Sequence, residues 1–176
     1  MDTKTITRAA VLSAITGVGF LLTAPVPLIP GAIHWRILAF LPCVFGILFG
    51  PITGFVAGAI GNTLWAVIGG YFNPATPIFD LIGVGLTGLI PGLMVKPEEC
   101  EKNEGLVKAA LISLVAGVIM VPIVAAGFAW VGVAPFSAAV TMLAISDLPP
   151  ILVGTPLAVK ALLPVAKARG WLEERW

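Results

Sequence analysis

The amino-acid sequence predicts an all-α integral membrane protein with six transmembrane helices and with both its N- and C-termini in the cytoplasm. Of the 176 residues, 59% are hydrophobic and only 11% are charged, whereas soluble domains carry about 25% charged residues. A helix that crosses a bilayer needs about 20 mostly apolar residues. The length therefore accommodates about six spans in a single membrane domain, residues 1–176, and leaves no room for a separate soluble domain.

The first half of the chain contains four apolar runs, which proline and glycine separate. Three prolines in residues 25–31 end the first run, because each removes a backbone donor and holds the chain extended. We read that run as an uncleaved helix rather than a signal peptide. Gly50-Pro51 separates the second and third runs as a turn, with proline suited to begin a helix. The four spans are expected at about residues 5–24, 33–50, 51–70 and 78–95.

The second half begins with the only strongly polar stretch, residues 96–104, which is expected to be an aqueous loop. A fifth span follows from residue 105 to about 131. Ser146 and Asp147 precede two prolines, and a short polar residue followed by proline is typical of a helix start. The sixth span is therefore expected from Asp147 to about Lys167. Residues 136–145 are either a re-entrant or interfacial segment, or an extension of the sixth helix bent at the two prolines.

The distribution of Lys and Arg sets the predicted orientation, because these residues are enriched in cytoplasmic flanks. With six spans, both termini lie on one side, and nine of the ten cationic residues fall there. Arg36 alone falls at the opposite face. The nine that place both termini in the cytoplasm are Lys4, Arg8, Lys96, Lys102, Lys108, Lys160, Lys167, Arg169 and Arg175.

Three ionisable residues are expected in the outer part of the membrane: Arg36, Asp80 and Asp147. Charged groups inside membrane spans are costly, so they are candidates for ligand binding. Each also has a structural interpretation. The aspartates can cap their helices, Arg36 can extend toward water, or Arg36 can form a salt bridge with one of them. For Asp147, the sequence leaves cap and ligand contact open.

The third span places Gly54, Gly58, Asn62 and Trp65 on one helical face. Glycines allow another helix to approach closely, and the face becomes polar and aromatic toward the outside. This pattern predicts a packed inner half that opens into an outer cavity. Asn62 either contacts a ligand or forms a hydrogen bond between helices, whereas Trp65 lies inside the span and is the favoured stacking residue for a flat ligand.

Other aromatic and polar residues complete the predicted ligand site. Trp35 and Trp130 fall at the outer interface, where an aromatic belt also accounts for them. No catalytic residue, metal or cofactor is expected, because the chain has one histidine, His34, two widely separated cysteines and no phosphate-binding loop. The candidate ligand-binding residues are Trp35, Arg36, Asn62, Trp65, Asn73, Asp80, Trp130 and Asp147.

The first helix carries a stripe of small residues, Ala10, Ala14 and Gly17. Such a stripe favours close contact with another helix. It predicts either internal packing or the docking of a partner subunit.

Three segments resemble the substrate-binding S components of energy-coupling factor (ECF) transporters, which import vitamins and other micronutrients. The segment RAAVLSA at residues 8–14 resembles their AxxxA-bearing first helix. Residues 49–62, FGPITGFVAGAIGN, are similar to their FGPxxGxxxGxxGD pattern, and residues 77–92, PIFDLIGVGLTGLIPG, to their GxxxGLxxGL pattern. Asn62 departs from the family pattern, in which an acidic residue is frequent.

The resemblance implies a high-affinity subunit that captures a B-type vitamin such as riboflavin or thiamine from outside the cell. It also implies a coupling membrane subunit and two ATPase subunits as partners, docked at Ala10 and Ala14. The residues leave two alternatives open. One is a self-sufficient small transporter or channel subunit, and the other is an intramembrane aspartyl protease that uses Asp80 and Asp147.

Overall fold

The computed structural model describes residues 3–23, 26–29 and 33–172, and the regular secondary structure in this part of the chain is helical apart from one short hairpin. Five of its helices, α1, α3, α4, α5 and α6, are long and apolar enough to cross a membrane. The elements are α1 (Thr3–Thr23), β1 (Pro27–Ile29), β2 (Ile33–His34), α2 (Leu41–Phe49), α3 (Pro51–Ile68), α4 (Pro77–Met94), the 3₁₀ helix η1 (Pro97–Glu101), α5 (Asn103–Trp130) and α6 (Phe136–Ala168).

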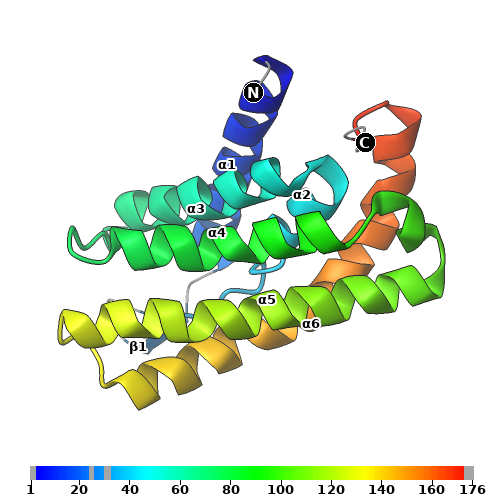
Figure 1. The fold of residues 1–176 in the computed structure, drawn as a ribbon. Helices are drawn as coiled ribbons and strands as arrows, with labels where there is room; N and C mark the ends of the chain where they lie inside the picture. Colours follow the sequence, from blue (N-terminus) through cyan, green and yellow to red (C-terminus); the bar gives the residue numbers. More distant parts are fainter. Residues whose placement is uncertain (1–2, 24–25, 30–32, 173–176) are drawn as a thin grey trace.

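The long helices pack in the order α1, α3, α4, α5, α6, and α2 lies between α3, α4 and α6. Figure 1 shows α3, α4 and α5 running antiparallel, with α1 crossing behind α3. The hairpin and α2 return the chain to the end from which α1 started. The start of α1 and the end of α6 therefore lie at the same end of the bundle.

The predicted second span, residues 33–50, is not one helix. Its first residues form β2, which pairs antiparallel with β1 through Pro27 and His34, and the helix begins only at Leu41. With nine residues, α2 is too short to cross a bilayer. Its residues from 42 to 48 are all buried, and a helix that is apolar all round belongs in a core. The apolar run reflects this burial rather than a membrane span.

The predicted start of the sixth span at Asp147 is also wrong. The helix α6 begins at Phe136 directly after Pro135, so residues 136–145 are its extension. Pro149 and Pro150 lie inside the helix, as do two later prolines. Neighbouring helices can satisfy the backbone groups that such prolines free. Figure 1 shows α6 changing direction toward its C-terminal end.

Helices α2, α3 and α4 meet through glycines with no space for a side chain. A Cβ atom on Gly46 would lie 2.0 Å from the carbonyl oxygen of Gly88, and one on Gly88 would lie 2.1 Å from that of Gly54. A Cβ atom on Gly54 would lie 2.4 Å from the Cα atom of Gly46. The three backbones therefore touch directly. We call Gly46, Gly54 and Gly88 the glycine contact.

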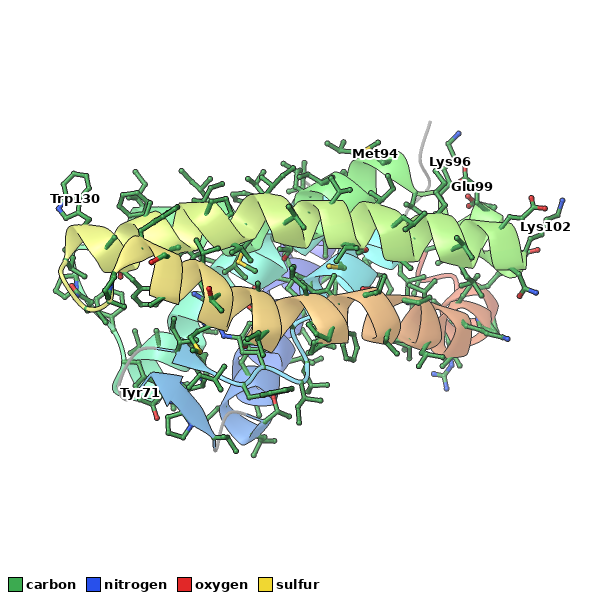
Figure 2. The ribbon with its side chains drawn as sticks, turned by 90° about the horizontal axis from the view of Figure 1, so that it is seen from below. Tyr71, Met94, Lys96, Glu99, Lys102 and Trp130 are labelled. Carbon is green, nitrogen blue, oxygen red and sulfur yellow. The ribbon has the colours of Figure 1, made fainter. Side chains whose placement is uncertain are left out.

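The polar stretch of residues 96–104, which we call the charged loop, and the hairpin of β1 and β2 lie at opposite ends of the bundle (Figure 2). Figure 2 shows Lys96, Glu99 and Lys102 at one end, and Tyr71 and Trp130 at the other. In the charged loop, the ammonium group of Lys108 donates a hydrogen bond of 2.7 Å to Glu99. Lys167 pairs with Glu101 in the same region, so this end carries both signs of charge.

A candidate ligand site at the hairpin end

A small cavity of about 70 Å³ lies at the hairpin end of the bundle. It combines residues from four parts of the chain: the segment after β2, the end of α3, the loop before α4 with the first turn of that helix, and the end of α5 with the α5–α6 connection. Four of the sequence-predicted ligand residues line it. The lining is Arg36, Trp65, Ala66, Tyr71, Asn73, Thr76, Asp80, Phe128 and Val133. We refer to this space as the hairpin cavity.

Arg36 is the charged centre of the hairpin cavity. Its side chain is 5% exposed, and the guanidinium carbon lies 4.5 Å from the centre of the Trp65 ring and 5.4 Å from that of Phe20. Among the described residues, no carboxylate lies within 4.0 Å of it. The salt bridge to an aspartate, one of the alternatives that the sequence left open for Arg36, is therefore absent from this structure. Cation–π contacts with two rings take its place, and such contacts strengthen when they are desolvated.

Asp80 lies in the first turn of α4 and lines the same cavity. The hydroxyl of Thr76 donates a hydrogen bond of 3.4 Å to its carboxylate. Thr76 is the residue that precedes the helix, and no side chain caps this helix by a hydrogen bond. Asp80 therefore does not act as the predicted cap, although a negative charge in the first turn favours the helix dipole.

Asp147 is buried in the middle of α6, at 1% exposure. It is therefore not a helix cap, which corrects one of its two sequence interpretations. The hydroxyl oxygen of Ser146 lies 2.7 Å from its carboxylate and 2.8 Å from the carbonyl oxygen of His34, so its one proton can serve either acceptor. The same hydroxyl accepts a hydrogen bond from the backbone N–H of Arg36. This network attaches the hairpin to α6.

The ring of Trp65, which contacts Arg36, belongs to a cluster of three rings with His34 and Tyr71. The ring centres of His34 and Tyr71 are 4.3 Å apart, and those of Trp65 and Tyr71 are 5.3 Å apart. Sequence reasoning missed His34 and Tyr71 as site residues. His34 of β2 and Arg36 just after it are buried, whereas Trp35 between them is 37% exposed. The expectation of a helix over this segment concealed that arrangement.

Trp65 of the cavity wall and two residues outside the lining, His34 and Asn62, each have a buried polar atom without a hydrogen-bond partner. These atoms are Nδ1 of His34, Oδ1 of Asn62 and Nε1 of Trp65. Buried polar groups in folded proteins nearly always have partners, from the protein or from bound molecules. Trp65 and Asn62 lie one turn apart on α3, and both are buried. They offer a donor and an acceptor to a molecule that enters this region.

The remaining predicted residues are dispersed. Asn73 lines the cavity and accepts a hydrogen bond from the backbone N–H of Ala75. Trp35 is 37% exposed and lines a separate apolar depression with Leu22 and Ile37. Trp130 is 76% exposed and only touches Phe79 by a ring edge. The structure does not bring either tryptophan to the hairpin cavity.

The small-residue stripe of α1 divides between two environments. Ala10 and Ala14 are exposed, whereas Gly17 is buried. A Cβ atom on Gly17 would lie 2.9 Å from the Cβ atom of Leu64 and 3.0 Å from the carbonyl oxygen of Gly61. Gly17 therefore packs internally against α3, which is one of the two roles that the sequence left open for the stripe, and it is not open to a docking partner.

Comparison with known proteins links the whole bundle to one family. The family described as "ECF-type riboflavin transporter, S component" matches residues 1–166. No curated protein and no solved structure matches the chain. The matched range covers every described helix except the last residues of α6.

Proposed function

The chain belongs to the S-component family of ECF-type riboflavin transporters, and from this membership we propose that it binds riboflavin in the hairpin cavity. Members of this family are substrate-binding subunits for vitamin uptake rather than enzymes, and the chain is a multi-pass protein of the cell membrane. The intramembrane protease alternative has no support from the family.

The observation that carries the proposal is the cluster of Arg36, Trp65 and Tyr71 beside unpaired polar atoms. Riboflavin has a flat ring system that can stack on aromatic side chains, with alternating donors and acceptors along one edge. Trp65 and Tyr71 supply the stacking faces, and Asn62 and Asp80 supply acceptors. A buried guanidinium at the centre of the site disfavours a cationic vitamin such as thiamine, because like charges repel in a desolvated site.

The cavity must enlarge before a vitamin can enter. Pockets for small molecules usually measure about 300–1,000 Å³, compared with about 70 Å³ here. The lining comes from separate chain segments, of which the segment after β2 is attached to α6 mainly through Ser146. Separation of that segment from α6 would open the space. Riboflavin binding should therefore change the surroundings of Trp65 and so its fluorescence.

Titration of the purified protein with riboflavin and with thiamine tests this function. Riboflavin should bind, and Trp65→Ala should weaken it by about tenfold to a hundredfold, which corresponds to the loss of about 1–3 kcal/mol. Trp130→Ala is the matched control, because Trp130 is exposed and its loss should change affinity little. Preference for thiamine, or equal effects of the two variants, would contradict the proposed site.

Family membership implies an ECF module as partner, and we propose that its coupling subunit docks at Ala10 and Ala14 and that two ATPases drive uptake. The exposure of both alanines supports docking. Ala14→Leu should abolish ATP-dependent uptake and leave riboflavin affinity nearly unchanged. Gly17→Ala should instead destabilise the subunit through its contact with Leu64. Uptake without ATPases would favour a self-sufficient transporter.

The proposed orientation places both termini and the charged loop in the cytoplasm. Cys100 is a poor reporter of this, because it is 2% exposed and burial raises the pKa of its thiol to about 11. Only thiolates react readily with maleimides. Lys102→Cys, in a background of Cys43→Ser and Cys100→Ser, places an exposed thiol in the same loop. An impermeant maleimide should label it only from the cytoplasmic side, and labelling from outside would reverse the topology.

A further inference from the structure

A second concavity lies at the opposite end of the bundle, beside the first turns of α1. Its volume is about 740 Å³, and its walls are mostly apolar. Val11, Leu12 and Ile15 of α1 form one wall, and Phe49 of α2 and Trp171 after α6 form the other. We call this space the α1 groove. It is separate from the hairpin cavity, with which it shares no residue.

The mouth of the α1 groove is cationic. Lys4 and Arg8 lie one turn apart on α1 and both line the groove. The guanidinium of Arg8 lies 5.4 Å from the centre of the Phe49 ring, which directs it along the groove. None of the described residues that line the groove is acidic. Among the described residues, no carboxylate lies within 4.0 Å of either cation.

A neighbouring depression at the same end of the bundle shows the opposite pattern. It is lined by Glu98, Glu99 and Glu104 together with Lys102 and Lys108. There, Lys108 forms an ion pair with Glu99 at 2.7 Å. A carboxylate thus neutralises Lys108 in this depression, whereas the described part of the chain supplies no such partner to Lys4 or Arg8 of the α1 groove.

We propose that the α1 groove binds an anionic phospholipid, with its phosphate at Lys4 and Arg8 and an acyl chain along Val11 and Ile15. The apolar wall continues into the exposed face of α1 at Val18 and beyond, which lies in the bilayer. A lipid from the surrounding leaflet therefore reaches the groove without leaving the membrane. Basic residues beside a transmembrane helix attract anionic headgroups, and a tryptophan such as Trp171 is typical of that interface.

Native mass spectrometry of the purified full-length subunit tests this site, with phosphatidylglycerol and phosphatidylcholine of identical acyl chains as probes. One phosphatidylglycerol should be retained in preference to phosphatidylcholine. Lys4→Gln and Arg8→Gln should each weaken that retention about fivefold. Lys102→Gln is the control, because it removes a cation from the acid-rich loop and should leave retention unchanged. Ile15→Trp should expel the lipid by filling the groove while both cations remain.

Two outcomes would overturn the proposal. The first is equal retention of both lipids, or equal loss in Lys102→Gln, because either means unspecific attraction to charge. The second is unchanged phosphatidylglycerol retention in Lys4→Gln, Arg8→Gln and Ile15→Trp, combined with loss of the coupling membrane subunit on co-purification. That result would assign the groove to a protein. Riboflavin binding by each variant reports folding at the other end, so a failure here is distinct from a failure of the hairpin cavity.

Discussion

The half of the bundle around the glycine contact and the half around the hairpin cavity are packed in different ways. At the glycine contact, Gly46, Gly54 and Gly88 bring three backbones together with no space between them. Around the hairpin cavity, large side chains leave a small space, and buried polar atoms of His34 and Trp65 lack partners. The hydroxyl of Thr53 beside the glycine contact is also buried without a hydrogen-bond partner, but the close-packed backbones leave no space there for a ligand. At the hairpin end such atoms lie close to a cavity, so they can gain hydrogen bonds when a molecule enters.

This difference separates stability from binding. Close contact between helix backbones maximises van der Waals attraction, which is the main source of helix association in membranes. An unpaired buried polar group costs about 1–3 kcal/mol, so the hairpin half gives up part of its stability. A ligand that supplies the missing partners regains it. Substitutions in the first half should therefore lower the stability of the fold, and those in the second should mainly lower affinity.

The largest effect is expected at the glycine contact. Gly88→Ala places a methyl group 2.1 Å from the carbonyl oxygen of Gly54, and backbone atoms of two helices must move to relieve the clash. We expect a loss of at least about 3 kcal/mol, measured as a large fall in the melting temperature of detergent-solubilised protein. Ile82→Ala, on an exposed face of the same helix, is the control. A melting temperature near that of the control would mean that this contact is adjustable.

An intermediate effect is expected in the hairpin half. Asp80→Asn removes an acceptor and a charge from the cavity wall while keeping the shape of the side chain. Riboflavin affinity should fall about tenfold, with little change in melting temperature. Asp147→Asn should show the reverse, because Asp147 does not line the cavity and its contact with Ser146 holds the hairpin to α6. Similar changes in affinity for the two variants would remove this distinction.

The smallest effect is expected in the charged loop, where water competes with every contact. The hydrogen bond from Lys108 holds the pKa of Glu99 below its ordinary value. A carboxyl group whose pKa is lower in the folded than in the unfolded protein stabilises the fold at pH values above its unfolded-state pKa. This contribution is lost as the pH falls through the folded-state pKa. Lys108→Gln should cost only about 0.2–1 kcal/mol at neutral pH. Melting curves of both proteins should converge in acid, and a difference that persists there would exclude this ion pair as its source.

Much of the fold could be read from the sequence because apolar length and glycine spacing are local properties. The spans around α1, α3, α4 and α5 follow from runs of about 20 apolar residues. The close approach of α3 follows from Gly54 and Gly58, which lie one turn apart. Four predicted ligand residues, Arg36, Trp65, Asn73 and Asp80, lie together because each falls near the same end of its element.

The remaining features depended on contacts between segments far apart in the sequence. An apolar run does not reveal whether it faces lipid or protein, so the buried helix α2 and its preceding hairpin resembled a span. In the sequence, a proline inside a helix cannot be told from one at a helix start, so α6 was expected to begin at Asp147. Only the packed structure shows whether neighbouring groups satisfy the backbone carbonyls that such a proline leaves without a donor. His34 joins Trp65 from β2, a segment far away in the sequence, whereas Tyr71 meets Trp65 through the turn that follows α3. Local patterns determined which segments are apolar, and tertiary packing decided which of their faces are buried.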